Sequence, residues 1–232
     1  MALRERQADS AWTGERPDLV DLIARALRGS RPETVRVLAD TARLLVAHPD
    51  EMIYRQGDPV PLTLILRGYG AFRRTTEDGQ LLTPGIGRAG DLFGFSSMAS
   101  VSSSVDLVAL TDCRVAQWPG TQVRALAGLD PGLALDAIDS LANSLHITVG
   151  RVEGFLHQDA RRRVIRILAR HQDLFFGDSP VLSRGHLPSL VGTSREMTGH
   201  VLRQLELEGT VLRVGRAGLR LMRPDRLKDG AG

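Results

Sequence analysis

Arg195, Glu196, His200 and Arg203 are the side chains whose types and spacing best suit hydrogen bonding to nucleic-acid bases and phosphates. A guanidinium bonds bidentately to guanine and a carboxylate accepts from the cytosine amino group, so Arg195 and Glu196 fit base edges. Gly199 would let a ligand approach the backbone closely, because glycine has no side chain. We therefore predict base contacts from Arg195, Glu196, Gly199 and His200. The predicted phosphate contacts are Ser183, Thr193, Ser194 and Arg203.

A helix over residues 194–207 has to position these groups. Thr193 is its predicted N-cap, and Glu196, three residues later, completes a capping box. Gly209 follows the predicted end of the helix. The inward face is formed by apolar residues at helical spacing: Met197, Val201, Leu202 and Leu205.

Shorter elements flank this helix on both sides. Leu187, Leu190 and Val191 predict a short helix that stops at Gly192. The segments VLRV and LRLM flank a turn at residues 215–218 and predict a two-stranded wing. Each feature alone also fits a helical hairpin with a solvated charged face. Together they favour a winged helix-turn-helix over residues 159–232, with its second helix in the major groove of double-stranded DNA.

The charge distribution supports the same interpretation. Residues 1–159 carry 16 Lys and Arg against 20 Asp and Glu, a balance of −4. Residues 160–232 carry 14 against 7, a balance of +7. A basic C-terminal region beside a mildly acidic one is typical of a protein whose C-terminal part meets phosphates.

The residues before this module predict an α+β protein with three further regions. Residues 1–34 form an N-terminal helical segment, with Pro32 opening a second helix. Residues 35–129 form a β-roll of the jelly-roll type, because short β-rich runs alternate with turn residues. The predicted strands lie at residues 62–68, 71–75, 80–86, 106–110 and 113–118.

A long helix is predicted over residues 130–158, capped by Asp130 with Pro131 in its first turn. Its apolar stripe steps by three and four residues, as in a coiled coil. Such a stripe has to be buried, either on the β-roll or on a second copy, and we favour a symmetric dimer. The predicted seam consists of Ile138, Leu141, Leu145, Thr148, Val152 and Phe155.

These three parts together resemble the CRP/FNR family of bacterial regulators, typified by the cyclic-AMP receptor protein. The resemblance covers residues 35–223 and rests on VGTSREMTGHVLRQLELEG, with QGD at 56–58, LILRG at 64–68 and GDLFG at 90–94. It implies a homodimeric transcription factor that binds a palindromic site, with RNA polymerase as a further partner. His200 stands where the family commonly has an Arg, so the half-site should depart from TGTGA.

The resemblance weakens at the family's nucleotide pocket. Phe95 stands where cyclic-AMP-binding members have a Glu, and Ser103-Ser104 stand where they have Arg-Ser. Thr148 matches the family's adenine contact. We therefore expect no cyclic AMP bound in the usual way, and either an unidentified small-molecule effector or none. The degenerate pocket comprises Gly94, Phe95, Ser96, Ser103, Ser104 and Thr148.

Other chemistries fit poorly. Cys113 is the only cysteine, which excludes a four-thiolate iron–sulfur cluster, and no His lies between Pro49 and Leu145 to ligate haem from the roll. The strands lack the His and carboxylate cluster that an enzyme of the cupin type needs. We expect no catalytic residues, no metal and no cofactor, and a cytoplasmic protein without a signal peptide or membrane span. The alternative function is a signalling adaptor that binds protein rather than DNA.

Overall fold

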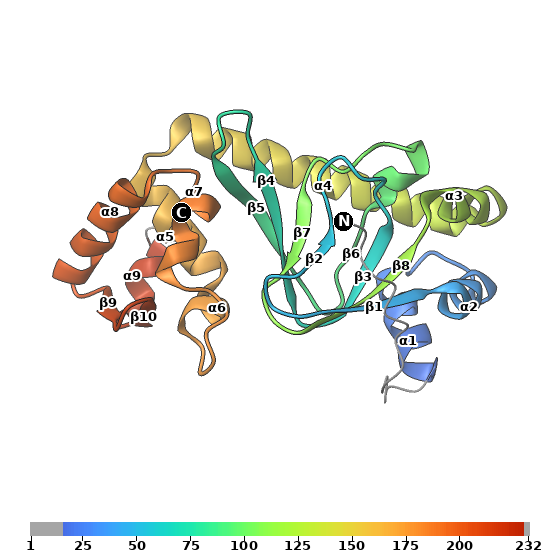
Figure 1. Cartoon of the computed structure of the whole chain (residues 1–232), viewed down its shortest axis with the longest axis horizontal. Helices are drawn as coiled ribbons and strands as arrows, with labels where there is room; N and C mark the ends of the chain where they lie inside the picture. The colour runs from blue at the N-terminus through green and yellow to red at the C-terminus, as the bar shows by residue number, and fades with distance from the viewer. Residues whose placement is uncertain (1–15, 230–232) are drawn as a thin grey trace. The chain divides into compact units, whose positions relative to one another are not determined.

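Residues 16–229 are described by a computed structural model (Figure 1). The expected N-terminal helical segment, residues 1–34, lies partly outside this range, as does the segment where a signal peptide would stand. The described part of it forms two helices, α1 (Arg16–Ala26) and the start of α2 (Pro32–Thr41). Pro32 opens α2 as predicted, because a proline lacks only an N–H that the first turn leaves unpaired.

Eight strands follow and form two antiparallel layers. The first sheet has the order β1-β8-β3-β6 and the second has the order β2-β7-β4-β5. Both orders place strands beside each other that are distant in the chain, as in a roll. The strands are β1 (Arg43–Ala47), β2 (Met52–Tyr54), β3 (Leu62–Arg67), β4 (Tyr69–Thr75), β5 (Leu81–Arg88), β6 (Leu92–Phe93), β7 (Asp106–Ala109) and β8 (Cys113–Trp118).

Strand β3 is buried on both faces, because Leu62, Thr63, Leu64 and Ile65 are all buried. One core lies between the sheets and includes Ile65, Leu107 and Val115. A second core includes Leu38, Leu64 and Trp118 and is covered by α1, α2 and the start of α4. The Trp118 indole donates to the carbonyl of Leu38 at 2.8 Å. The helices are therefore an integral part of the roll domain.

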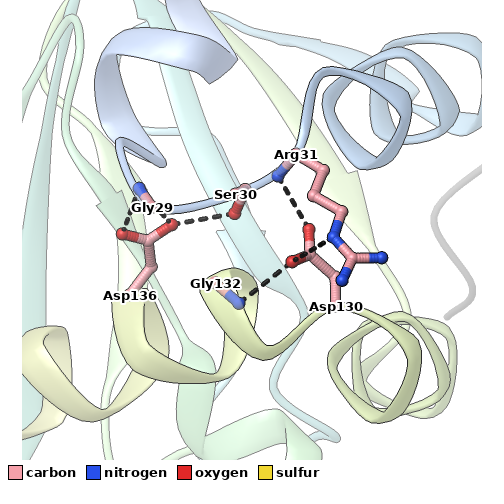
Figure 2. A network of polar contacts seen from close by, with 6 residues as sticks. All are labelled: Gly29, Ser30, Arg31, Asp130, Gly132 and Asp136. Carbon is pink, nitrogen blue, oxygen red and sulfur yellow. Dashed lines mark hydrogen bonds and ion pairs between the residues drawn. The ribbon is translucent and has the colours of Figure 1, made fainter.

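Two aspartates fasten the α1–α2 linker to the beginning of α4 (Pro131–His157), as Figure 2 shows. The backbone N–H of Gly29 lies 3.0 and 3.1 Å from the two carboxylate oxygens of Asp136, and the Ser30 hydroxyl donates at 2.8 Å. A Cβ at Gly132 would overlap the Gly29 carbonyl oxygen, so the two backbones approach as only glycine permits.

Asp130 makes the second half of this fastening. It is 2% exposed and accepts from the backbone N–H of Arg31 at 2.8 Å and of Gly132 at 2.9 Å. The hydrogen bond from the Thr34 side chain is the main reason that the pKa of this carboxyl lies below its usual value. The predicted role of Asp130 as cap of the long helix is confirmed, and its bond to the α1–α2 linker was not expected.

The C-terminal elements form a winged helix-turn-helix. They are α5 (Ala160–Arg170), α6 (Gln172–Phe176), η2 (Arg184–His186), α7 (Leu187–Val191), α8 (Arg195–Leu207), β9 (Val211–Val214), β10 (Gly218–Leu221) and α9 (Pro224–Asp229). The short helix, the second helix and the wing were predicted, whereas α5, α6, η2 and α9 were not. The sequence interpretation also missed the 3-10 helix η1 (Phe95–Ala99) and α3 (Gly120–Leu129) at the end of the roll.

The chain divides into two compact units. The first contains residues 1–72 and 86–145, and the second contains residues 73–85 and 146–232. The end of the β4–β5 hairpin thus belongs to the second unit, where the Thr83 hydroxyl donates to the Ser189 hydroxyl at 2.9 Å.

Candidate nucleic-acid interface

The turn before α8 is set by a left-handed glycine. Gly192 ends α7 with φ of 67°, and a Cβ there would lie 2.6 Å from the Phe155 ring. Both the conformation and the close packing therefore require glycine at this position. The turn fixes the direction in which α8 leaves α7.

The N-cap of α8 is Ser194, so the prediction of Thr193 was wrong by one residue. The Ser194 hydroxyl accepts from the backbone N–H of Met197 at 3.0 Å. Thr193 still belongs to the preceding turn, because its N–H donates to the carbonyl of Pro188. Glu196 is exposed and makes no capping box with the described backbone.

The inner face of α8 packs largely as predicted. Val201, Leu202 and Leu205 are buried, but Met197 is 45% exposed and its assignment to the inner face was wrong. Thr198 takes the inner position instead, and its hydroxyl donates to the Ser194 carbonyl at 2.9 Å.

The outer face of α8 presents free polar side chains. Arg195, Glu196, His200 and Arg203 are all exposed and have no hydrogen bond or ion pair with another residue of the described range 16–229. A Cβ at Gly199 would meet nothing within 4 Å. These groups thus share one open face, and their donors and acceptors remain available to a ligand.

Two arginines that sequence reasoning missed hold the wing. Arg213 on β9 donates to Glu206 on α8, from Nε at 2.7 Å and from the backbone at 3.1 Å. Arg184 donates through its side chain to the carbonyls of Arg216 and Gly215, and its N–H donates to Ala217. Arg184 and Arg213 are therefore engaged in building the wing, unlike Arg195 and Arg203 on the outer face of α8.

Ser183 begins the 3-10 turn η2, upstream of α7. Its backbone N–H donates to His186 Nδ1 at 2.9 Å, and its hydroxyl lies 3.1 Å from the same nitrogen. The side chain is half-buried. Its hydroxyl is thus already engaged within the chain, unlike the groups on the outer face of α8.

Two residues of the predicted effector pocket, Gly94 and Phe95, are packed tightly against the roll. Phe95 is 3% exposed and packs into the core with Leu62 and Trp118. Gly94 has φ of 98°, and a Cβ there would overlap the Pro61 carbonyl oxygen. Ser96 follows in η1 and is half-buried. A buried aromatic side chain thus occupies the position next to the GDLFG turn.

Ser103 is also hydrogen-bonded within the roll. Its hydroxyl donates to the Val105 carbonyl at 2.5 Å, and its N–H donates to the Asp58 carbonyl at 2.8 Å. Ser104 and Thr148 are exposed, and Thr148 lies on α4 within the second compact unit. The one buried serine hydroxyl of this pair is therefore oriented toward its own loop.

The seam of α4 is exposed in the single chain. Thr148 is exposed on the same helix. The apolar seam residues have large exposed fractions: Ile138 60%, Leu141 44%, Leu145 66%, Val152 51% and Phe155 49%.

Within residues 16–229, no group of three or more His, Cys, Asp or Glu could hold a metal ion. No helix of that range is long and apolar enough to cross a membrane.

Comparison with known proteins agrees with this architecture. A family model described as the cyclic nucleotide-binding domain matches residues 44–129. The cAMP-activated global transcriptional regulator Vfr of Pseudomonas aeruginosa is 26% identical over 190 residues, which cover 76% of this chain and 87% of Vfr.

Solved structures show the same fold. FixK2 from Bradyrhizobium japonicum superposes with a TM-score of 0.70 at 21% identity, covering 83% of this chain and 98% of FixK2. A CRP/FNR-family transcriptional regulator from Thermus thermophilus superposes with a TM-score of 0.66 at 23% identity, covering 82% of this chain and 98% of that one. The roll thus matches the cyclic nucleotide-binding domain, and the chain shares the fold of these solved CRP/FNR-type structures.

Proposed function

We propose that this protein is a homodimeric regulator that binds a two-fold symmetric DNA site through α8. The observation that carries the proposal is the outer face of α8. Arg195, Glu196, His200 and Arg203 project there without partners in the described chain, beside the open position of Gly199. Guanidinium and carboxylate groups on the first turns of such a helix read base edges in the major groove.

The exposed seam of α4 supports the dimer. Five large apolar side chains exposed by 44–66% on one helix stripe are unfavourable in water. A second copy of the same helix covers them in a symmetric way, with one stripe packed on the other. The two copies of α8 then enter major grooves about 34 Å apart.

His200 sets the expected sequence preference. A neutral imidazole makes one donor bond and cannot fork onto guanine as a guanidinium does. The half-site that we propose is therefore related to TGTGA but altered or relaxed at one base. Ser183, Thr193, Ser194 and Arg203 are the proposed phosphate contacts, and of the serines Ser194 is the more exposed.

We further propose that cyclic AMP is not the effector in the usual way. Vfr is named as cAMP-activated, but here Phe95 fills a core position and Ser103 bonds within its own loop. A cyclic phosphate in a half-buried pocket needs a cation or converging N–H donors. Isothermal titration with cyclic AMP should give no heat of binding, and saturable binding would refute this part.

The protein thus acts in the cytoplasm with DNA and, when it activates, with RNA polymerase. Fluorescence anisotropy with a symmetric duplex, measured across a salt series, tests the DNA proposal. We expect affinity to fall steeply with salt, and Arg195→Ala to weaken binding by about 1–3 kcal/mol. Arg36→Ala, an exposed arginine on α2, is the matched control. Binding that is absent or insensitive to salt would favour a protein-binding adaptor.

A further inference from the structure

Four arginines gather where α4 turns into α5, and we call them the arginine cluster: Arg151, Arg163, Arg166 and Arg170. Three of them lie on α5 at spacings of three and four residues, which places them on one helix face. The opposite face of α5 is buried and carries Val164, Ile165 and Leu168.

The arginine face of α5 lies against the last turns of α4. The guanidinium carbon of Arg163 lies 5.4 Å from the centroid of the Phe155 ring. Arg166 Nη1 lies 3.3 Å from the place that a Cβ on Gly154 would take. Gly154 is buried, and a Cβ there would make a tight contact with the guanidinium. The cluster is therefore packed at a helix corner rather than spread on an open surface.

The charges of the cluster are not balanced by the described part of the chain. Arg151, Arg166 and Arg170 have no hydrogen bond or ion pair with any residue of the range 16–229. By contrast, Arg161 and Arg213 each bond a glutamate, at 2.7 and 2.6 Å. Burial of half-buried Arg151, and then the charge of Arg170, lower the pKa of the Arg151 guanidinium. Both effects disfavour a cation unless an anion is bound nearby.

Two polar atoms at the same corner also have no partner among the described residues. Arg163 Nε and Gln158 Oε1 are buried without a hydrogen bond, although Arg163 Nη1 donates to the Gln158 carbonyl at 2.8 Å. Of the two, Arg163 Nε is a donor, and a buried donor that is left unpaired costs free energy and calls for a ligand or water.

DNA bound by α8 would lie on the wrong side to neutralise this cluster. The buried face of α5 packs against α7, α8 and α9, so α8 lies on the side of α5 that faces away from the arginines. The outer face of α8 is directed further from α5, since its inner residues Val201, Leu202 and Leu205 are the ones buried. A separate, smaller anion fits the cluster better than the duplex.

We propose that the arginine cluster binds a small phosphorylated anion at the α4–α5 corner. Guanidinium groups bind phosphate through paired N–H donors, and three of these side chains have donors to spare. Because the corner joins the helix of the seam to the helix-turn-helix, an anion held there would fix the angle between α4 and α5. That regulatory consequence rests on the proposed DNA-binding function, whereas the binding itself does not.

Titration of the full-length protein with inorganic pyrophosphate at constant ionic strength tests the site. We expect saturable binding of one pyrophosphate per chain. Arg151→Gln with Arg170→Gln should weaken it at least about tenfold, the usual result when charge-assisted bonds are lost. The control removes two exposed arginines from the same unit, Arg162→Gln with Arg223→Gln, and should bind as the unaltered protein does. Arg170→Gln alone, at an exposed position, gives a variant whose folding is not at risk.

Three results would overturn the proposal. One is the absence of saturable binding to the unaltered protein, and another is an equal loss in the control, which would indicate diffuse charge. The third comes from titrating the same variants with duplex DNA. If Arg151→Gln with Arg170→Gln loses affinity for DNA, and the unaltered protein does not bind pyrophosphate, these arginines contact DNA phosphates instead. A protein that binds pyrophosphate but no DNA would refute the proposed function and leave the anion site standing.

Discussion

Glu206 and Arg213 join the last turns of α8 to the first strand of the wing. The carboxylate of Glu206 accepts from Arg213 Nε at 2.7 Å and from the Arg213 backbone N–H at 3.1 Å, and it forms an ion pair with Arg213 Nη2 at 2.6 Å. Both side chains are partly exposed, at 24% and 34%. The pair thus sets the wing relative to α8 by two hydrogen bonds and an ion pair rather than by deep burial.

Glu206→Gln should lower the free energy of unfolding slightly at neutral pH, because a partly exposed ion pair contributes little to stability. The hydrogen bonds from the Arg213 side chain hold the pKa of Glu206 below 4.5. A lowered pKa stabilises the fold above the ordinary value, and this contribution disappears as the pH falls through the folded-state pKa.

Urea denaturation at neutral pH and at about pH 3 measures how the contribution of Glu206 to stability depends on pH. The deficit of Glu206→Gln should be present at neutral pH and smaller in acid. Glu77→Gln, at an exposed turn, should show no deficit at either pH. A deficit that grows in acid would contradict the role of the ion pair.

Asp130→Asn should loosen the fastening between the α1–α2 linker and α4. The carboxylate accepts from Arg31 and Gly132, and a hydrogen bond from Thr34 holds its pKa below 3.8. We expect a loss of about 1–2 kcal/mol at neutral pH, because partly buried donors lose a charged acceptor. This contribution is present above the ordinary pKa and is lost on acidification, so the variant should have a flatter dependence below about pH 4.

Thermal unfolding followed by circular dichroism across that pH range measures the Asp130 effect. Asp139→Asn, an exposed aspartate on the same helix, is the control and should follow the unaltered protein. If both variants had the same pH profile, the lowered pKa of Asp130 would not contribute to stability.

Leu145→Lys should convert the proposed dimer to a monomer, because a lysine in the middle of the α4 seam would have to be buried without a partner. Leu145 is 66% exposed in the single chain. Leu129→Lys changes a leucine that is 76% exposed on α3, outside the seam, and serves as the matched control. Light scattering after size-exclusion chromatography should give a monomer mass for the first variant only. If both variants had the mass of a dimer, the interface would lie elsewhere.

Helical periodicity was sufficient to predict the outer face of α8, because exposure there follows from local spacing. It did not distinguish Ser194 from Thr193 as the cap, since both are good N-cap residues one position apart. Met197 was misassigned because the inner stripe is narrower than the apolar pattern, and Thr198 fills the place.

Contacts between segments that are distant in the chain could not be predicted from the sequence. Asp136 and Gly29 are 107 residues apart, and nothing in either local pattern indicates that they meet. The hydrogen bond between Thr83 and Ser189, within the second compact unit, is likewise not indicated by either local pattern. The arginine stripe of α5 is visible as a pattern, but its packing against Phe155 and Gly154 depends on the turn between two helices.

His200→Arg should restore a bidentate contact that the native imidazole cannot make. His200 is exposed and has no partner among residues 16–229, so the substitution should not disturb folding. We expect the variant to gain about 1–3 kcal/mol for a TGTGA half-site over the site preferred by the native protein. Competition anisotropy with the two duplexes measures the ratio, and an unchanged ratio would remove His200 from the base-reading set.

Selection of binding sites from a random duplex library tests the central claim most directly, because it assumes neither the sequence nor the stoichiometry. We expect an enriched site with two inverted half-sites whose centres are about 10 base pairs apart, related to TGTGA but changed at one base. Recovery of no enriched sequence, or of a single site without two-fold symmetry, would contradict a dimer that reads DNA through the outer face of α8.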